Sequence, residues 1–341
     1  MQAGTEERRM HDGPRTAQPK LLVTGACGFI GANLCHYFAE RGWRVYAIAG
    51  PKGRSWRLPA QAAATVVRVD LLDADAVCSA VQAIDPNFIV NCAAFGAYAS
   101  QQDAPRIYQV NVLGLRNLLE AARRLDGLGA VVQLGSSSEY GANCQGPAET
   151  APCWPDSDYA VSKVAATALT RLFAHKHGLR AFALRLYSVY GPYEDMSRLI
   201  PQLTLKARKG QWPPLVGRDI SRDFVYVDDV CRAIAMTCER APQLLSGDVF
   251  NIGSGVCCTL EDLVLCAQQV FGVQRAPVWG SMPQRHWDHT RWYGNPTHAH
   301  TTLGWRSETS LRDGLQRTMA WVEDHPHLIE AARQNTVLGA V

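Results

Sequence analysis

A glycine-rich segment near the start of the chain, TGACGFIG at residues 24–31, restricts the fold more than any other feature. It follows the apolar run LLVTG, which predicts a buried strand, and it opens a stretch of helical periodicity that ends at Gly42. Glycine permits a positive φ and a close approach of the backbone to a phosphate, and a helix N-terminus favours an anion. We therefore predict that Gly25, Gly28 and Gly31 hold a dinucleotide pyrophosphate, although the spacing is GxxGxxG rather than GxGxxG. The alternative is that these glycines serve only a tight turn.

Apolar strands and amphipathic helices alternate along the first half of the chain. The expected strands lie in LLVTG, WRVYAIA, ATVVRVD, NFIVNCAA, AVVQLGS and RAFALRL. The expected helices are Ile30–Arg41, Ala74–Ile84, Tyr108–Leu125 and Asp158–His177. Right-handed crossovers between successive strands give a parallel sheet covered on both faces. We therefore predict an α/β fold, with a Rossmann-type doubly wound parallel sheet over residues 20–186 and its ligands beyond the carboxyl ends of the strands.

The regular alternation of strands and helices ends at about Tyr187. Strands are expected in RDFVYVDDV and VFNIGSG, a helix follows the first of them, and Leu311–Asp324 reads as an amphipathic helix. We predict that residues 187–341 are mainly a smaller α/β lobe that binds the substrate. Residues 1–19 are polar and lack the apolar centre of a signal peptide, so they predict a disordered tail.

Composition narrows the class of protein. Hydrophobic residues make up 47% of the 341 and charged residues 19%, which is enough apolar material for a large core. The net charge of +3 without a dense basic block does not suggest a nucleic-acid partner. The 11 cysteines include no CxxC pair, so we expect reduced thiols, a cytoplasmic location and no metal site. No apolar run approaches the length of a membrane span.

The end of the second expected strand bears on the choice of cofactor. NAD binding favours an acidic residue there, but the sequence AIAGPKGR has Ala49, followed by Lys52 and Arg54. These residues favour NADP over NAD, unless the two cations are only solvated loop charges. After the third strand come Asp70 and Leu71, where a carboxylate could accept from the adenine amino group or cap the next helix.

A tyrosine and a lysine four residues apart, Tyr159 and Lys163, share one face of an expected helix. An ammonium beside a phenol favours the phenolate and lowers its pKa, so the pair could remove a proton from an alcohol. YxxxK alone is a weak signal. The serine cluster LGSSSEYG at residues 134–141 strengthens it, because a serine at a strand end could donate to the same substrate oxygen.

Glycine loop, serine cluster and YxxxK, in this order, resemble the extended short-chain dehydrogenase/reductase family. The segments NCAAFGA, NVLG, RLYSVYGP, RDFVYVDDV and NIGSG add to the resemblance, which runs from Lys20 to about Glu323. Together they are similar to the nucleotide-sugar epimerase and dehydratase branch. The resemblance is specific for the superfamily and weak for the individual reaction.

The resemblance implies catalytic roles. Tyr159 would be the base, Lys163 its partner, and Ser137 the third catalytic residue. Ser136 is the alternative to Ser137, because SSSEYG is one residue shorter than the common pattern. Glu139 would be the acidic residue that takes the C5 proton in a dehydratase, or else a structural or solvent-facing carboxylate.

Binding roles follow from the same resemblance. The implied cofactor contacts are Gly25, Gly28, Phe29, Ile30, Gly31, Arg54, Asp70, Leu71, Ala93, Ala94, Asn111, Tyr159 and Lys163, with Asn111 either structural or a contact. Arg222 and Arg285 would hold a nucleotide diphosphate, because arginines suit phosphate oxygens, and Arg291 is an alternative to Arg285. Arg222 and Arg285 could instead be surface charges. Ser188, where the family often has asparagine, would contact the substrate.

The implied function is an NAD(P)-dependent enzyme that oxidises C4 of a nucleotide diphosphate sugar, most simply an epimerase. The alternatives are a 4,6-dehydratase, an NADPH-dependent 4-keto-sugar reductase and, more distantly, a non-catalytic nucleotide-binding protein. The family pairs its two long helices, here Tyr108–Leu125 and Asp158–His177, into a four-helix bundle, which predicts a homodimer.

Overall fold

The computed structural model describes residues 18–60, 63–98, 100–285 and 288–338, so the tail expected at residues 1–19 lies almost wholly outside the described residues. The first half contains β1 (Lys20–Thr24), α1 (Phe29–Glu40), β2 (Arg44–Ala49), η1 (Ser55–Arg57), β3 (Ala64–Arg68), α2 (Ala74–Ile84), β4 (Phe88–Asn91), α3 (Ala104–Tyr108), the π-helical η2 (Gln109–Gly114), α4 (Leu115–Ala122), β5 (Ala130–Ser136), η3 (Ser137–Tyr140), α5 (Asp158–His177) and β6 (Ala181–Leu186). The second half contains β7 (Ser188–Tyr190), α6 (Leu199–Ala207), β8 (Ser221–Arg222), β9 (Phe224–Tyr226), α7 (Val227–Arg240), η4 (Ala241–Gln243), β10 (Val249–Ile252), β11 (Cys258–Thr259), α8 (Leu260–Phe271), the π-helical η5 (Ala299–Leu303), α9 (Leu311–Asp324) and α10 (Pro326–Leu338).

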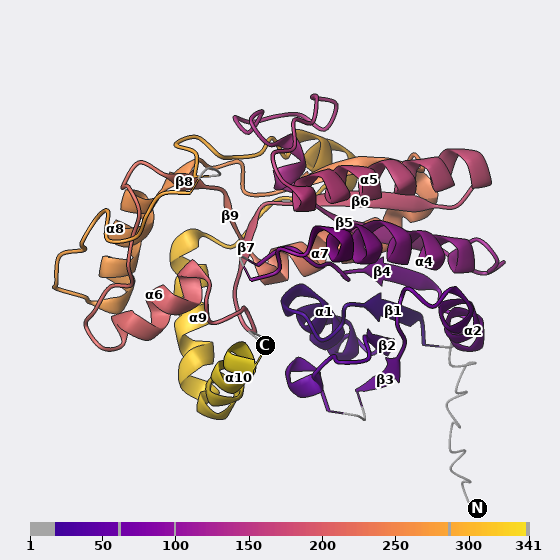
Figure 1. Cartoon of the computed structure of the whole chain (residues 1–341), viewed down its shortest axis with the longest axis horizontal. Helices are drawn as coiled ribbons and strands as arrows, with labels where there is room; N and C mark the ends of the chain where they lie inside the picture. The colour runs from indigo at the N-terminus through magenta and orange to yellow at the C-terminus, as the bar shows by residue number, and fades with distance from the viewer. Residues whose placement is uncertain (1–17, 61–62, 99, 286–287, 339–341) are drawn as a thin grey trace, which may run out of the picture.

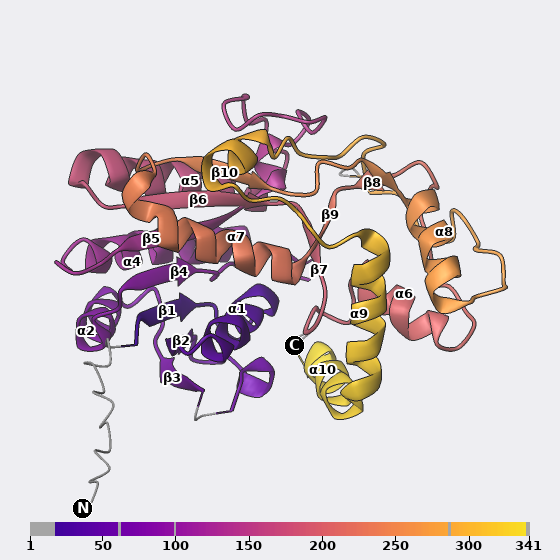
Figure 2. The same ribbon diagram turned by 180° about the vertical axis from the view of Figure 1, so that it is seen from behind.

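A seven-stranded sheet with the order β10-β6-β5-β4-β1-β2-β3 forms the larger part of the molecule, and all its neighbouring strands are parallel. Helices α2, α4 and α5 cover one face (Figure 1), and α1 and α7 cover the other (Figure 2). Each face has its own apolar core, one around Phe38 and Ile234 and the other around Leu118 and Phe173. The predicted doubly wound α/β fold is confirmed.

Helix boundaries follow the sequence pattern closely, with one exception. The observed ranges of α2, α5 and α9 are the expected ones. The helix expected at Tyr108–Leu125 is wrong at its start, because Asp103 caps an earlier turn by accepting from the Arg106 N–H at 3.1 Å. A π-helical segment then joins α3 to α4. The N-terminal cap, rather than the apolar periodicity, sets where this helical stretch begins.

The second half of the chain forms a smaller lobe beside the sheet and also contributes to the sheet. The lobe contains α6, α8, α9 and α10 (Figure 1), with the short pairs β8–β11 and β7–β9. In contrast, β10 returns to pair with β6 in the large sheet, and α7 packs on its face. Residues beyond 187 therefore belong to both parts. No helix of the described ranges is long and apolar enough to cross a membrane.

Candidate active site

The glycine loop lies between β1 and α1, and its close backbone packing leaves no room for side chains at two of its glycines. Gly25 has a φ of +61°, and a Cβ there would lie 2.6 Å from the backbone nitrogen of Ala93. A Cβ on Gly31 would collide with the Gly25 carbonyl. Gly28 caps α1 without a side-chain hydrogen bond, and the first turn contains no acidic residue. The first turn of α1 is therefore suited to a pyrophosphate, which fits a dinucleotide.

Other expected cofactor contacts lie at the same edge of the sheet. Phe29 and Ile30 form the first turn of α1, while Ala93 and Ala94 follow β4, with the Ala93 backbone against Gly25. The Asp70 carboxylate accepts from the Leu72 N–H at 3.0 Å and does not cap α2. The cap is Asp73, which accepts from the Ala76 N–H, so the capping alternative for Asp70 is wrong.

Asn111 is buried, and its side-chain amide is fully used within the protein. It accepts from the Phe95 N–H at 2.8 Å and donates to the Phe95 carbonyl and the Ser162 hydroxyl, both at 2.9 Å. The amide thus pins the loop after β4 to α5. This geometry favours the structural role for Asn111 over a cofactor contact.

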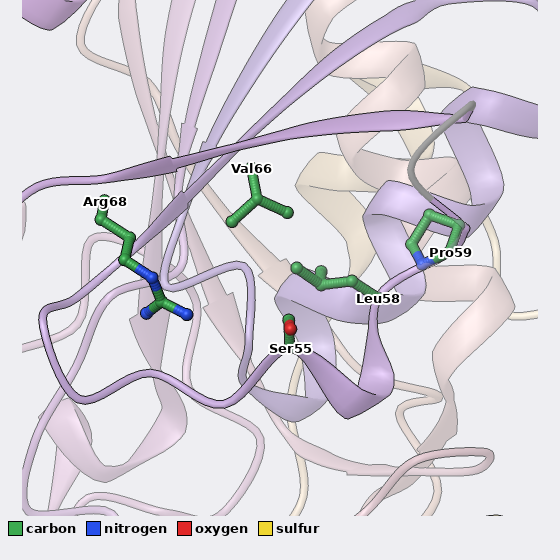
Figure 3. Close-up of a pocket in the computed structure, with 5 residues that line it drawn as sticks. All are labelled: Ser55, Leu58, Pro59, Val66 and Arg68. Carbon is green, nitrogen blue, oxygen red and sulfur yellow. The ribbon is translucent and has the colours of Figure 1, made fainter.

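The loop after β2 borders a cavity of about 370 Å³ (Figure 3). Its lining residues are Ser55, Leu58, Pro59, Val66 and Arg68, and none of them is acidic. Arg68, which sequence reasoning missed, donates to the Gly53 carbonyl at 2.9 Å. Arg68 at the end of β3 thus contacts the loop between Lys52 and Arg54 and adds a third cation to this part of the chain.

Arg57 was also missed, and it links the glycine loop to the substrate side. Its Nη1 donates to the Cys27 carbonyl at 3.3 Å, and its Nε donates to the Tyr193 carbonyl at 2.9 Å. Tyr193 itself has a φ of +65° and stacks on His36 of α1. The loop after β7 is therefore held against the cofactor loop by one guanidinium.

Helix α5 brings Tyr159 and Lys163 onto one face, with Lys163 Nζ 5.9 Å from the centre of the tyrosine ring. Lys163 is buried and donates to the Leu134 carbonyl at the end of β5. Burial lowers the pKa of Lys163 to about 8, against the opposing charge of Glu139. Burial raises the pKa of Tyr159, and the contact with Ser136 opposes this shift. The net direction is opposite to the lowered pKa expected from a neighbouring ammonium, because burial has the larger effect.

The serine cluster divides into different environments. Ser136 lies near Tyr159 and lowers the pKa of its phenol, and Ser138 Oγ donates to Ser136 Oγ at 2.8 Å. Ser137 is buried on the other side of the turn, where its hydroxyl accepts from Trp292 Nε1 at 3.2 Å. The geometry therefore favours Ser136 over Ser137 as the third member of the site. The shorter SSSEYG pattern was the signal for this alternative.

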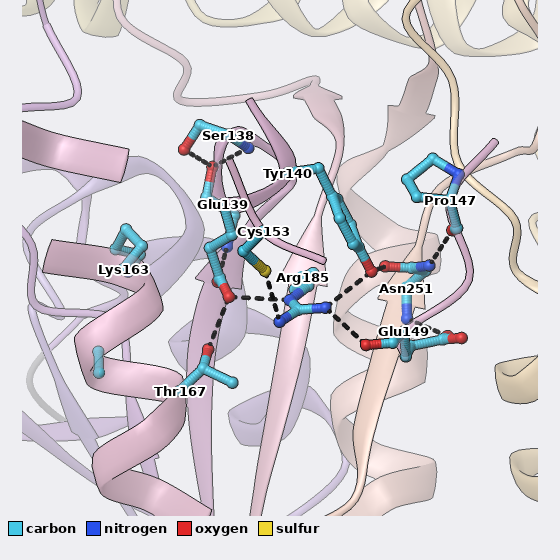
Figure 4. Close-up of polar contacts among 12 residues, drawn as sticks. Ser138, Glu139, Tyr140, Pro147, Glu149, Cys153, Lys163, Thr167, Arg185 and Asn251 are labelled. Atoms are coloured by element: carbon cyan, nitrogen blue, oxygen red, sulfur yellow. Dashed lines mark hydrogen bonds and ion pairs between the residues drawn. The ribbon is translucent and has the colours of Figure 1, made fainter. Parts of the chain in front are cut away.

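Glu139 lies in the protein interior next to the dyad, not on a surface that a substrate could reach. Its side chain is 0% exposed and pairs with Arg185 Nε at 2.8 Å (Figure 4). It also accepts from the Thr167 hydroxyl and from the Ser136 N–H, each at 2.9 Å. A carboxylate with three donors in a closed pocket is not placed to take a substrate proton, so the structural alternative for Glu139 fits the geometry.

Arginines gather at the opposite end of the site. Arg222 Nη2 pairs with Asp288 Oδ1 at 2.7 Å, and the Arg285 N–H donates to Asp288 Oδ2 at 2.8 Å. One carboxylate therefore brings the two expected diphosphate residues together. The other candidate, Arg291, lies nearby, where its carbonyl accepts from the Cys144 thiol.

Ser188 and Arg198, a residue that the sequence did not indicate, complete this end. Ser188 opens β7, and its N–H donates to the Asp223 carbonyl at 2.9 Å. Arg198 caps the start of α6, and its guanidinium lies 5.3 Å from the centre of the Tyr98 ring. The charge of Arg198 lowers the pKa of both Tyr159 and Arg222. The charge of Arg198 therefore acts on both the dyad and the arginine pair.

A model of the NAD dependent epimerase/dehydratase family matches residues 21–253. The chain belongs to this family. The resemblance to the extended short-chain dehydrogenases/reductases, the NAD(P)-dependent enzyme class and the Rossmann-type fold are thereby confirmed, and the cofactor is established at the level of an NAD-dependent family.

Relatives within the NAD dependent epimerase/dehydratase family have different reactions in their names. A dTDP-glucose 4,6-dehydratase of Streptomyces antibioticus is 30% identical over 320 residues, covering 89% of this chain and 92% of its own. UDP-glucuronate 4-epimerase 4 of Arabidopsis thaliana is 27% identical, covering 88% and 74%. The UDP-glucose 4-epimerase of Thermotoga maritima, solved with UDP-glucose, superposes with a TM-score of 0.80 at 27% identity, covering 90% of this chain and 99% of its own.

Proposed function

We propose that the protein oxidises C4 of a nucleotide diphosphate sugar and acts as an epimerase. The observation that carries this proposal is the convergence of Ser136, Tyr159 and Lys163 at the carboxyl ends of the strands, beyond the glycine loop. Tyr159 takes the proton of the C4 hydroxyl, Lys163 supports its phenolate, and Ser136 donates to the same sugar oxygen. The nicotinamide, when bound, supplies the acceptor for the C4 hydride.

The placement of Glu139 supports epimerisation over dehydration. A 4,6-dehydratase needs an acidic group that removes the C5 proton and helps to expel the C6 hydroxyl. The Glu139 carboxylate is already committed to Arg185 and to two further donors. An epimerase needs no such group, because the 4-keto sugar only turns before hydride returns to its other face.

A reductase is the second candidate, supported by the cationic surroundings of the loop after β2. Arg68 contacts this loop between Lys52 and Arg54, and the cavity beside the loop has no carboxylate among its lining residues. These charges suit the 2′-phosphate of NADP better than the bare hydroxyl of NAD. We therefore propose a preference for NADP. An NADPH-dependent reductase would start from a 4-keto sugar and consume the cofactor.

The nucleotide diphosphate is proposed to lie between the dyad and the smaller lobe. Arg222 and Arg285, held by Asp288, would bind the phosphate oxygens, and Arg198 would neutralise the side nearer the dyad. Ser188 would contact the sugar.

Two further expectations remain proposals. Exposed Val161, Ala168 and Leu172 lie at helical spacing on α5, which supports pairing of two copies through this helix. A cytoplasmic location rests on the cysteine usage of the sequence.

Product mass tests the function. The purified protein is incubated with nucleoside diphosphate sugars and their 4-keto forms, with NAD or NADP, and products are analysed by mass spectrometry. An epimer of unchanged mass supports the proposal. Loss of water indicates a dehydratase, and a gain of two hydrogens indicates a reductase. A Tyr159→Phe variant that binds cofactor should lose turnover; retained turnover would sink the catalytic assignment.

A further inference from the structure

A buried carboxylate lies directly behind the dyad and takes no part in the proton transfers proposed above. Glu139 accepts from the Ser136 N–H, the Thr167 hydroxyl and Arg185 Nε (Figure 4). The absence of a side chain at Gly135 makes this possible, because a Cβ there would lie 2.6 Å from Glu139 Oε1. The carboxylate is therefore fixed in one orientation.

The partner guanidinium is equally committed. Arg185 is 5% exposed, and its Nη1 donates to the Tyr140 hydroxyl at 2.8 Å and to the Glu149 carbonyl at 3.1 Å. Its Nη2 donates to the Cys153 sulfur at 3.4 Å. A buried ion pair with its remaining donors satisfied holds its geometry, whereas removal of one partner leaves an uncompensated charge.

The groups bonded to Glu139 belong to the elements that carry the dyad. Ser136 ends β5 and contacts Tyr159, while Thr167 lies one turn beyond Lys163 in α5. One carboxylate thereby sets the spacing between the end of β5 and the face of α5 that holds the dyad. A change in its position would alter the contact between the Ser136 hydroxyl and the phenol.

The same carboxylate acts on the dyad through its charge. Glu139 raises the pKa of Lys163 against the larger effect of burial, and it also raises the pKa of Tyr159. The positive charge of Arg185 acts in the opposite sense on any neighbouring group. Two other ionisable groups of the described residues act on the dyad: Cys92 raises the pKa of Lys163, and Arg198 lowers the pKa of Tyr159.

We propose that Glu139 and Arg185 are positioning residues, which fix Ser136 and α5 and balance the charge that the dyad experiences. The expected effect of these residues on turnover rests on the proposed function. Their expected effect on cofactor binding does not. Lys163 is the group expected to hold the nicotinamide ribose, so its ionisation governs cofactor affinity as well as proton transfer.

Neutralising each partner separately should shift the pH dependence in opposite directions. Glu139→Gln removes a negative charge, so the charged form of Lys163 is less favoured and reduced-cofactor binding is lost at lower pH than in wild type. Arg185→Gln leaves the Glu139 carboxylate without its cationic partner. The charged form of Lys163 is then more favoured, so binding is retained to higher pH. We expect displacements of about half a pH unit or more, measured as the dissociation constant of NADPH and NADH by fluorescence between pH 6 and pH 10.

The double variant Glu139→Gln with Arg185→Gln restores the balance of charge and should return the profile to that of wild type. Arg185→Lys keeps the charge and should leave the profile in place. Opposite displacements of the single variants support the proposal. Displacements in one direction, or weaker binding with an unmoved profile, would show a structural role alone and overturn it.

A single neutralisation can prevent folding, which circular dichroism and melting will reveal. Cys153→Asp then tests the proposal. It keeps the Glu139–Arg185 ion pair and adds a negative charge beside the Arg185 guanidinium. The profile should move to higher pH; an unmoved profile overturns the proposal. Wild-type turnover of nucleotide sugars is measured alongside. Its absence would refute the proposed function while the binding profiles still decide the role of the pair.

Discussion

Arg222 and Asp288 form an ion pair of 2.7 Å that connects strand β8 to the segment following the second arginine, Arg285. The pair is largely buried, with side-chain exposures of 22% and 8%. Asp288 holds the Arg222 guanidinium with one oxygen and the backbone N–H of Arg285 with the other, so it orients the Arg222 charge before any diphosphate arrives. Preorganisation of this kind lowers the entropy lost when a ligand binds.

Arg222→Gln should raise the KM for the nucleotide sugar about 10- to 100-fold, because a charge-assisted hydrogen bond contributes about 1.5–3 kcal/mol. Its effect on kcat should be small. Arg222→Lys should recover only part of the affinity, since a lysine lacks the planar fork. Arg218, an exposed arginine of the same segment paired with Glu261 at 3.5 Å, provides the control. An equal rise in KM for Arg218→Gln would contradict the assignment.

Ser136→Ala should lower kcat about 100-fold, because it removes the donor beside the Tyr159 phenol. Ser137→Ala should have a much weaker effect, since that hydroxyl contacts Trp292 instead. Steady-state rates of the two variants, compared at saturating cofactor, check the assignment. The reverse order of effects would restore Ser137 as the catalytic hydroxyl.

Arg54→Asp should raise the KM for NADP about 10-fold or more and leave the KM for NAD little changed or lower, because it places a carboxylate where a 2′-hydroxyl can donate. Arg44→Asp, at the opposite end of β2, is the matched control. Initial rates with NADP and with NAD give the ratio of the two KM values for each variant. If wild type already prefers NAD, the proposed NADP preference is wrong.

Leu172→Asp should produce a monomer if α5 pairs with a second copy, since a carboxylate in the centre of an apolar interface stays unpaired. Leu265, 52% exposed on α8, is the control position for the same change. Light scattering of wild type and both variants measures the mass. A wild-type monomer would refute the dimer itself.

Glu194 makes stability depend on pH in a direction unusual for a carboxyl group. Burial raises its pKa to about 8, and its Oε2 has no hydrogen-bond partner within the described structure. The folded state therefore holds a proton that the unfolded state releases above about pH 4.5, so stability falls as pH rises towards 8 and levels off above it. Glu194→Gln should abolish this loss and be more stable than wild type at pH 9, by on the order of a few kcal/mol. Denaturant unfolding at pH 6 and pH 9 measures the difference; equal pH dependence in both proteins would contradict it.

The sequence was sufficient for the sheet, the glycine loop and the YxxxK pair, because each depends on local periodicity or on a fixed spacing. It did not separate Ser136 from Ser137, because a tight turn decides which hydroxyl faces Tyr159. It also missed Arg198 and Arg57, whose contacts join segments far apart in the chain. Helix α8 was missed as well, although the capping box of Thr259 and Asp262 was a readable signal for its start.

Strand β10 supplies the outermost strand of the large sheet beside β6, although many residues of the smaller lobe lie between them in sequence. A nascent chain that ends before β10 therefore has no strand to cover the apolar edge of β6. Such an edge is a template for pairing with other nascent chains. We expect a fragment ending near residue 186 to aggregate rather than fold, and the full chain to rely on chaperone protection until β10 has emerged.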